Sequence, residues 1–198
     1  MKRRFNDRYI SGNLPWNIDR PDYNLVSTVR DFEIKAGKAI DIGCGTGDNV
    51  FWLTQNGFTV TGIDISEKAI DMALKKSEQK SLHAEFYVRD ILRDEIPGNP
   101  YDFAFDRGCF HTFDKKKQRR DYARRVHNLL DEGGHWLTLM GNVDDGRIDI
   151  GPPKRTALEV VTAVEPLFEI LQLKQGRFDS NDVVPSKIWV CLMKKRGH

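Results

Sequence analysis

The stretch Ala39-Ile-Asp-Ile-Gly-Cys-Gly-Thr-Gly47 decides the fold class of this chain. It begins as a short apolar strand, predicted over 38–42, and runs into a loop with glycines at 43, 45 and 47. Because glycine adopts backbone conformations closed to other residues, such a loop turns sharply and lets a ligand approach the backbone. A helix is predicted next, over 48–56, and Gly57 ends it. The free N–H groups at its start face whatever binds at the carboxyl end of the strand.

Downstream of this loop, short apolar runs alternate with amphipathic helical patterns. Strands are predicted over 58–63, 84–88, 101–106 and 135–140, and helices from Ser66 onward and over 116–130, the latter stopped by Gly133-Gly134. This alternation is typical of an α/β fold with a mostly parallel sheet and helices on both faces. The pattern then changes: a helix over 156–164 precedes strands over 168–173 and 187–193, with no helix between them. These two strands predict an antiparallel hairpin at the sheet edge.

One domain is predicted for residues 1–198, because this length buries a single sizeable core. We divide it into an N-terminal segment, 1–34, that covers the ligand site, a binding core over 35–140, and a C-terminal part over 141–198. The C-terminal part contains the hairpin and a glycine- and proline-rich stretch over 141–155. A long loop in a compact domain is usually a lid or a binding loop.

The composition excludes several classes of protein. Lys and Arg total 31 against 29 Asp and Glu, and this balance argues against an obligate nucleic-acid binder. No apolar run approaches the ~18 residues that cross a bilayer. The three cysteines, Cys44, Cys109 and Cys191, match neither a disulfide framework nor a zinc site. We therefore expect a cytoplasmic protein that uses no metal and binds neither nucleic acid nor membrane.

The acids around the glycine loop distinguish between nucleotide ligands. A dinucleotide site needs a third glycine where this chain has Asp48, whose carboxylate would repel a pyrophosphate. Asp41, just before the loop, instead suits a ligand that carries an ammonium and a sulfonium. Asp64 and Asp90, at the ends of the next two strands, are placed to bind ribose hydroxyls and an adenine amino group. Together these residues predict an adenosine-shaped site without phosphates.

Three motifs, Asp41 to Gly47, Val60 to Ser66 and Arg89 to Ile91, resemble those of class I S-adenosylmethionine-dependent methyltransferases. The resemblance implies a Rossmann-like, doubly wound sheet of seven mostly parallel strands and S-adenosylmethionine as cofactor. The cofactor-binding residues expected on this basis are Trp16, Asp41, Gly43, Gly45, Gly47, Asp64, Ile65, Asp90, Ile91 and Arg107.

Other segments narrow the resemblance to the thiopurine and thiol methyltransferase branch, which includes tellurite-resistance-like members. They are Gly12-Asn-Leu-Pro-Trp16, Phe105-Asp-Arg-Gly-Cys-Phe-His111 and Gly151-Pro-Pro153. Trp16 is expected to cover the cofactor, by stacking or by a cation–π contact. The alternative is a hydrophobic packing residue that ties the N-terminal segment to the core. Lys154 stands where family members commonly have an aromatic residue, which leaves the accepted substrate open.

Two side chains near the expected methyl position have alternative interpretations. Arg107 is expected to present its backbone to the methionine part of the cofactor, or to pair with Asp106 or Asp102 as a structural residue. His111 is a candidate catalytic base, and the alternative is a loop histidine bonded to backbone.

The predicted activity is methyl transfer to a small-molecule nucleophile, with a thiol or soft anion favoured. Displacement at an activated methyl group needs alignment and exclusion of water more than a catalytic side chain. The alternatives are an O- or N-methyltransferase with His111 as base, and a protein that binds S-adenosylmethionine without turnover. The expected partner is a small molecule, and the expected state is a monomer or weak dimer.

Overall fold

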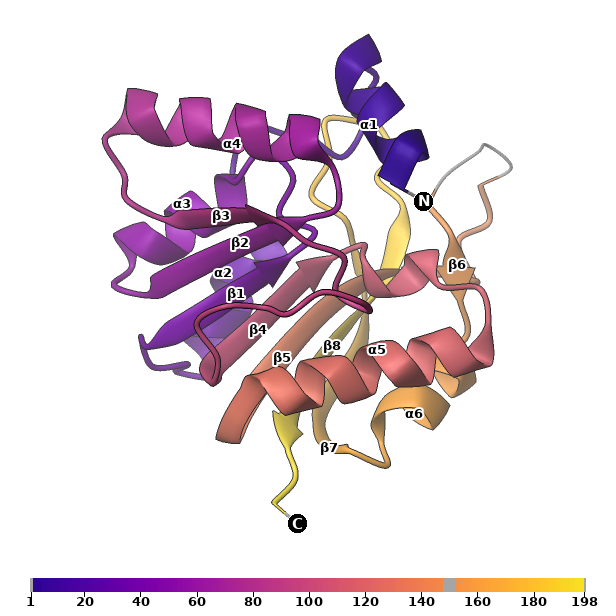
Figure 1. Cartoon of the computed structure of the whole chain (residues 1–198). Coiled ribbons are helices and arrows are strands. Elements are labelled where there is room, and N and C mark those ends of the chain that lie inside the picture. Colours follow the sequence, from indigo (N-terminus) through magenta and orange to yellow (C-terminus); the bar gives the residue numbers. More distant parts are fainter. Residues whose placement is uncertain (1, 148–151, 198) are drawn as a thin grey trace.

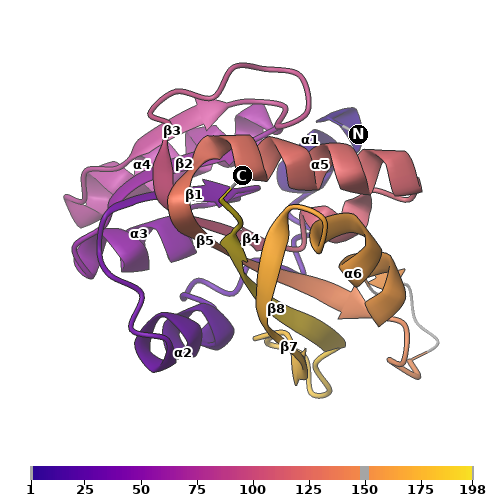
Figure 2. The same cartoon turned by 90° about the horizontal axis from the view of Figure 1, so that it is seen from below.

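The computed structural model describes residues 2–147 and 152–197 and is built around a twisted sheet with helices on both faces (Figures 1 and 2). In this part of the chain the strands are β1 (Lys38–Ile42), β2 (Thr59–Asp64), β3 (Glu85–Val88), β4 (Tyr101–Arg107), β5 (Leu130–Asn142), β6 (Lys154–Arg155), β7 (Phe168–Arg177) and β8 (Lys187–Lys195). The helices are α1 (Lys2–Ser11), α2 (Tyr23–Asp31), α3 (Asp48–Gln55), α4 (Glu67–Lys80), α5 (Lys116–Leu129) and α6 (Ala157–Val164), with a 3₁₀ turn, η1 (Phe110–Thr112).

The sheet has the order β3-β2-β1-β4-β5-β8-β7, and β6 pairs with the end of β5. β1 to β5 run parallel to one another, whereas β8 is antiparallel to both β5 and β7. The predicted mostly parallel α/β sheet with a C-terminal antiparallel hairpin is confirmed. The short β6 is an addition to the seven strands expected.

Two hydrophobic cores cover the two faces of the sheet. On one face α2, α3 and α4 contribute Leu25, Val50 and Ile70, and on the other α5 and α6 contribute buried side chains around Trp136 (Figure 2). Neighbouring β5 residues Trp136 and Leu137 enter opposite cores, as alternation along a strand requires. The doubly wound arrangement therefore leaves the carboxyl ends of β1 to β4 as the free edge for a ligand.

Helix starts follow the predicted chemistry. Ser66 caps α4 by accepting a hydrogen bond from the Ala69 N–H at 3.2 Å. Thr156 caps α6 in a capping box with Glu159. Within the described part of the chain, no helix is long and apolar enough to cross a membrane.

Two local predictions in the second half were wrong. Gly133-Gly134 does not end α5, because α5 stops at Leu129 and both glycines lie within β5. A Cβ on Gly134 would lie 3.0 Å from the Asp131 carbonyl and 3.2 Å from the Tyr101 carbonyl of β4, so glycine eases the close pairing of these strands. The 141–155 stretch is also shorter than expected, since β5 extends to Asn142 and 154–155 form β6. Its middle, with Gly151 of the Gly-Pro-Pro motif, lies outside the described residues.

Candidate active site

The glycine loop folds back onto the end of β2. The N–H groups of Gly43 and Cys44 both donate to the Ile63 carbonyl, at 2.7 and 3.0 Å. Gly43, Gly45 and Gly47 have φ angles of +76°, +55° and +88°, in the left-handed region that favours glycine. Gly47 is also the N-cap of α3. The loop therefore has the tight turn predicted for it.

Asp41 lies beneath this loop as an unsatisfied acid. It is only 1% exposed, and no group in the described residues hydrogen-bonds its Oδ2 atom. Burial, with added repulsion from the Asp106 and Asp64 carboxylates, raises the pKa of Asp41 well above its ordinary value. A buried carboxylate without a partner is costly, so a cationic ligand group would stabilise it.

Asp64 shapes the loop while it faces the same space. Its two carboxylate oxygens accept hydrogen bonds from the Gly45 and Ser66 N–H groups at 3.0 and 2.8 Å. Burial raises the pKa of Asp64 to about 6, and these backbone donors oppose the rise. Each oxygen has a second lone pair that can accept from a ligand hydroxyl.

The remaining expected residues lie around the ends of β2 and β3. Asp90 accepts from the Leu92 N–H at 2.9 Å and lies 3.7 Å from Arg93. Ile65 is half-buried between Asp64 and the α4 cap, whereas Ile91 is 5% exposed and packs in the core beside α5.

The N-terminal segment lies across the loop. We call residues 12–22, between α1 and α2, the strap. The Trp16 Nε1–H of the strap donates to the Tyr9 hydroxyl of α1 at 3.1 Å, and that hydroxyl is 2.9 Å from where a Cβ on Gly45 would lie. The Thr46 hydroxyl of the loop donates to Asn17 of the strap at 2.8 Å. Trp16 thus packs against α1 at the loop.

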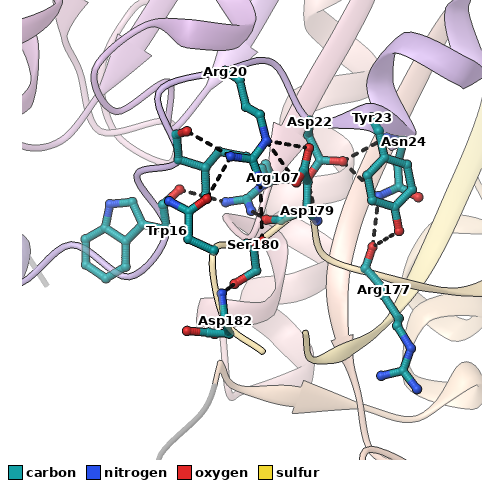
Figure 3. Close-up of polar contacts among 12 residues, drawn as sticks. Trp16, Arg20, Asp22, Tyr23, Asn24, Arg107, Arg177, Asp179, Ser180 and Asp182 are labelled. Atoms are coloured by element: carbon teal, nitrogen blue, oxygen red, sulfur yellow. Dashed lines mark hydrogen bonds and ion pairs between the residues drawn. The ribbon is translucent and has the colours of Figure 1, made fainter. Parts of the chain in front are cut away.

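Arg107 joins the strap to two other segments (Figure 3). Its guanidinium donates to Asp22 at 2.6 Å, to the Trp16 carbonyl at 3.1 Å, and to the Asp179 carbonyl between β7 and β8. Asp22 is fully buried, so this is a buried ion pair. Neither alternative partner expected from the sequence is used.

Both of those acids bind elsewhere. Asp106 accepts from the Cys109 and Phe110 N–H groups and from Trp136 Nε1, while Asp102 accepts from the Lys38 N–H.

A small pocket of about 50 Å³ lies where these parts meet. It is lined by Trp16, Asn17, Ile18, Arg20, Asp22, Gly43, Cys44, Gly45, Thr46, Asp48, Asn49 and Arg107. The structure therefore brings Trp16, Gly43, Gly45 and Arg107 together at one pocket. This pocket is smaller than the ~300–1,000 Å³ that is typical of ligand pockets.

Comparison with known proteins agrees with this geometry. Residues 39–134 match the family model described as a methyltransferase domain. The chain is 39% identical over 109 residues to an uncharacterized methyltransferase of Schizosaccharomyces pombe, covering 54% of this chain and 74% of that protein. The chain belongs to the class I S-adenosylmethionine-dependent methyltransferases. It is also 30% identical over 145 residues to a probable thiol methyltransferase 2 of Arabidopsis thaliana, which confirms the resemblance to the thiol methyltransferase branch.

The coverage differs between sequence and structure relatives. The match covers 72% of this methyltransferase and 62% of the Arabidopsis protein. The fold is similar to that of a structure solved in work on the conversion of a disulfide bond into a thioacetal group during echinomycin biosynthesis. The TM-score is 0.84, and the match covers 98% of this chain and 91% of the other. The sequence identity there is 24%, so this likeness concerns the fold alone.

The residues present fit the family's cofactor. S-adenosylmethionine carries an ammonium, a sulfonium and a ribose diol. Among the described residues, Asp41 has a buried side-chain oxygen without a partner that suits the ammonium group. Asp64, at the end of β2, keeps lone pairs that suit the ribose diol. The Gly43 backbone is exposed, so a ligand can approach it closely.

Sequence reasoning missed Tyr9 and Lys76. The Lys76 ammonium of α4 lies 2.7 Å from Asp19 of the strap and 3.0 Å from Asp48 of α3. These partners are 57 and 28 residues away along the chain, so no local pattern signals the contact. Tyr9 sits in a short helix whose docking onto the loop is likewise a long-range event.

His111 is bonded to backbone. This residue lies in η1, just beyond β4, and is 6% exposed. Its Nδ1 atom accepts a hydrogen bond from the Gly141 N–H of β5 at 3.0 Å. Burial lowers the pKa of His111 to about 3, and the nearby Arg155 and Arg107 charges add to this effect. The imidazole is therefore neutral at physiological pH.

The cysteines near the site are not activated thiols. Burial raises the pKa values of both Cys44 and Cys109 well above the ordinary value, with nearby carboxylates adding to each rise. A neutral buried thiol is a poor nucleophile, so neither cysteine is suited to covalent catalysis.

Proposed function

We propose that this methyltransferase transfers the methyl group of S-adenosylmethionine to a thiol or another small soft anion. The observation that carries the cofactor part is the unpaired Asp41 carboxylate, 1% exposed beneath the glycine loop. A ligand with a cationic ammonium group supplies the partner that this acid lacks. A pyrophosphate ligand would instead add negative charge next to three buried carboxylates.

The roles of the other residues follow from their positions. Asp64 accepts from the ribose hydroxyls, and Asp90 accepts from the adenine amino group at the end of the next strand. The glycine backbone lies along the cofactor, with Ile65 and Ile91 on the adenine side and Trp16 and Arg107 on the methionine side. Asp41 faces the ammonium group.

The chain's own residues have little bond chemistry to perform. The bound cofactor supplies an already activated methyl group, so binding, alignment and exclusion of water remain. The strap is suited to excluding water, because Trp16 and the Arg107–Asp22 pair hold it across the loop.

A thiol or soft-anion acceptor is favoured for two reasons. Two of the chain's relatives are named a probable thiol methyltransferase and a thiocyanate methyltransferase. In addition, the low pKa of His111 makes this side chain a weak base. A thiol acceptor needs little help from a base, because a few per cent of its molecules are already thiolate at neutral pH. The three cysteines are free within the described residues, as is common in the cytoplasm, where we propose that the enzyme acts on a small molecule as a monomer or weak dimer.

The test is a screen for S-adenosylhomocysteine release with thiols, thiocyanate, halides, tellurite, phenols and amines. We expect release with thiols or soft anions, and none in the Asp41→Asn variant, which keeps the shape of the side chain and loses its charge. Release with phenols or amines alone would favour the O- or N-methyltransferase. Cofactor binding without release from any acceptor would favour a non-catalytic binding protein.

A further inference from the structure

The His111 ring is held in one orientation and one tautomer. Its Nδ1 atom accepts the Gly141 N–H at 3.0 Å, so the Nδ1 lone pair is already used. A neutral imidazole carries its single proton on the other nitrogen when Nδ1 is an acceptor. The Nε2 atom of His111 therefore presents an N–H donor and has no lone pair with which to take a proton.

The Nε2 edge of this ring lies at the end of β4. A Cβ on Gly108 would lie 3.1 Å from Nε2, and the Gly108 backbone is held by its N–H bond to the Leu139 carbonyl at 2.8 Å. Gly108 has a φ of +84°, a conformation that favours glycine, and a side chain at this position would crowd this edge of the ring. The donor therefore lies beside Gly108, the residue that follows Arg107, and Arg107 lines the pocket.

The charges around the ring differ from those around the glycine loop. Arg155 of β6 binds the His111 carbonyl at 2.6 Å, and Arg107 of β4 is the other cation that acts on the ring. Phe178, next to β7, packs edge-on against the ring with 6.2 Å between centroids. Asp41 and Asp64 gather instead under the loop. Both arginines act on the ring as cations, and each is also paired with an acid, Arg155 with Asp114 and Arg107 with Asp22.

We infer that His111 is a positioning residue that binds the anionic methyl acceptor by donating a hydrogen bond from Nε2, and does not act as a base. This inference rests on the proposed function. The acceptor arrives as a thiolate, its proton already lost to solvent, or as a sulfur anion such as thiocyanate, and its sulfur electron pair forms the new S–C bond as the sulfonium S–C bond breaks. No proton passes to the protein, and anion plus cation yield two neutral thioethers.

Two conservative variants separate the two nitrogens of the ring. In His111→Asn the amide oxygen takes the place of Nδ1 and can still accept from Gly141, but the distal donor is lost. In His111→Gln the amide nitrogen reaches the position of Nε2 and restores a donor there. We expect His111→Asn to keep cofactor affinity while the KM for thiocyanate or a small thiol rises about tenfold or more. We expect His111→Gln to recover most of that loss.

Two results would overturn the role of His111 in an active enzyme. An unchanged acceptor KM in His111→Asn would mean that the ring is only structural. A fall in kcat of about 10²–10⁴-fold in both variants, restored at high pH, would identify a general base. A wild-type protein that releases no S-adenosylhomocysteine with any acceptor would instead overturn the proposed function itself.

A spectroscopic measurement tests the tautomer without using turnover or the variants. We expect ¹⁵N NMR of the wild-type imidazoles to show His111 protonated at Nε2 and unprotonated at Nδ1 from pH 5 to 8. Protonation at Nδ1, or a ring that titrates in this range, would overturn the inference even if the variants fold poorly.

Discussion

At the scale of single residues, the site is dominated by three buried carboxylates beneath one loop. Asp41, Asp64 and Asp106 all have raised pKa values, chiefly because burial disfavours the charged form. The sequence predicted Asp41 and Asp64 as ligand-facing acids because each ends a strand. It did not predict that Asp106 would bind Trp136 and two backbone N–H groups, since these contacts require the folded end of β4.

The raised pKa of Asp64 makes a prediction about stability and pH. Its pKa is about 6 in the fold against 3.8 as the ordinary value. The contribution of Asp64 to stability is therefore fully present below about pH 4 and is lost as the pH rises to about 6. Asp64→Asn removes this loss, so its free energy of unfolding relative to wild type should rise by about 2 kcal/mol between pH 4 and pH 7.5. Urea unfolding at both pH values measures this, and a pH-independent difference would contradict it.

The same residue makes a prediction about affinity. Asp64→Ala removes a carboxylate expected to accept two ribose hydroxyls, so cofactor binding should weaken at least tenfold. Because Asp64 also accepts from Gly45 and Ser66, some stability will be lost as well. Ser66→Ala is the matched control, since it removes the α4 cap at about 1 kcal/mol and leaves the acid in place. Equal cofactor affinities in the two variants, measured by calorimetry, would refute the role of Asp64.

At the scale of elements, local signals predicted most of the sheet and the helices that cover it. β1, α3 and α4 begin within a residue or two of their predicted starts, because Gly47 and Ser66 set helix starts through local backbone chemistry. The prediction that Gly133-Gly134 ends a helix was wrong because pairing between β4 and β5 outweighs the local preference of these glycines for a turn. β6 was missed because it exists only by pairing with the end of β5.

The strap gives the element-scale prediction. Arg107→Met leaves the fully buried Asp22 without its ion partner and should lower the free energy of unfolding by about 3–5 kcal/mol. Arg20→Ala is the control, because Arg20 also ties the strap to Asp179, at 2.5 Å, but is 42% exposed. The free energy of unfolding lost in Arg20→Ala should be much smaller than that lost in Arg107→Met, because the exposed pair is screened by solvent. Similar losses in the two variants, measured by urea unfolding, would mean that burial does not set the strength of the Arg107 pair.

At the scale of the whole molecule, the site depends on contacts that no stretch of sequence contains. The core motifs were predictable because the loop, Asp64 and Asp90 follow consecutive strands of a parallel sheet. The position of the strap was not predictable, because it depends on contacts between residues far apart in the chain. Arg107 and Asp22 are 85 residues apart, and Arg20 and Asp179 are 159 residues apart. Residues of the strap line the pocket of about 50 Å³ over the glycine loop.

Titration calorimetry of the wild-type protein with S-adenosylmethionine and with NAD tests the central claim most directly. The acids beneath the loop and Asp48 at the start of α3 favour a cationic, phosphate-free adenosine ligand. We predict binding of S-adenosylmethionine at one site per chain, loss of that binding in Asp41→Asn, and no binding of NAD. Tighter binding of NAD, or S-adenosylmethionine affinity that survives Asp41→Asn unchanged, would contradict the account.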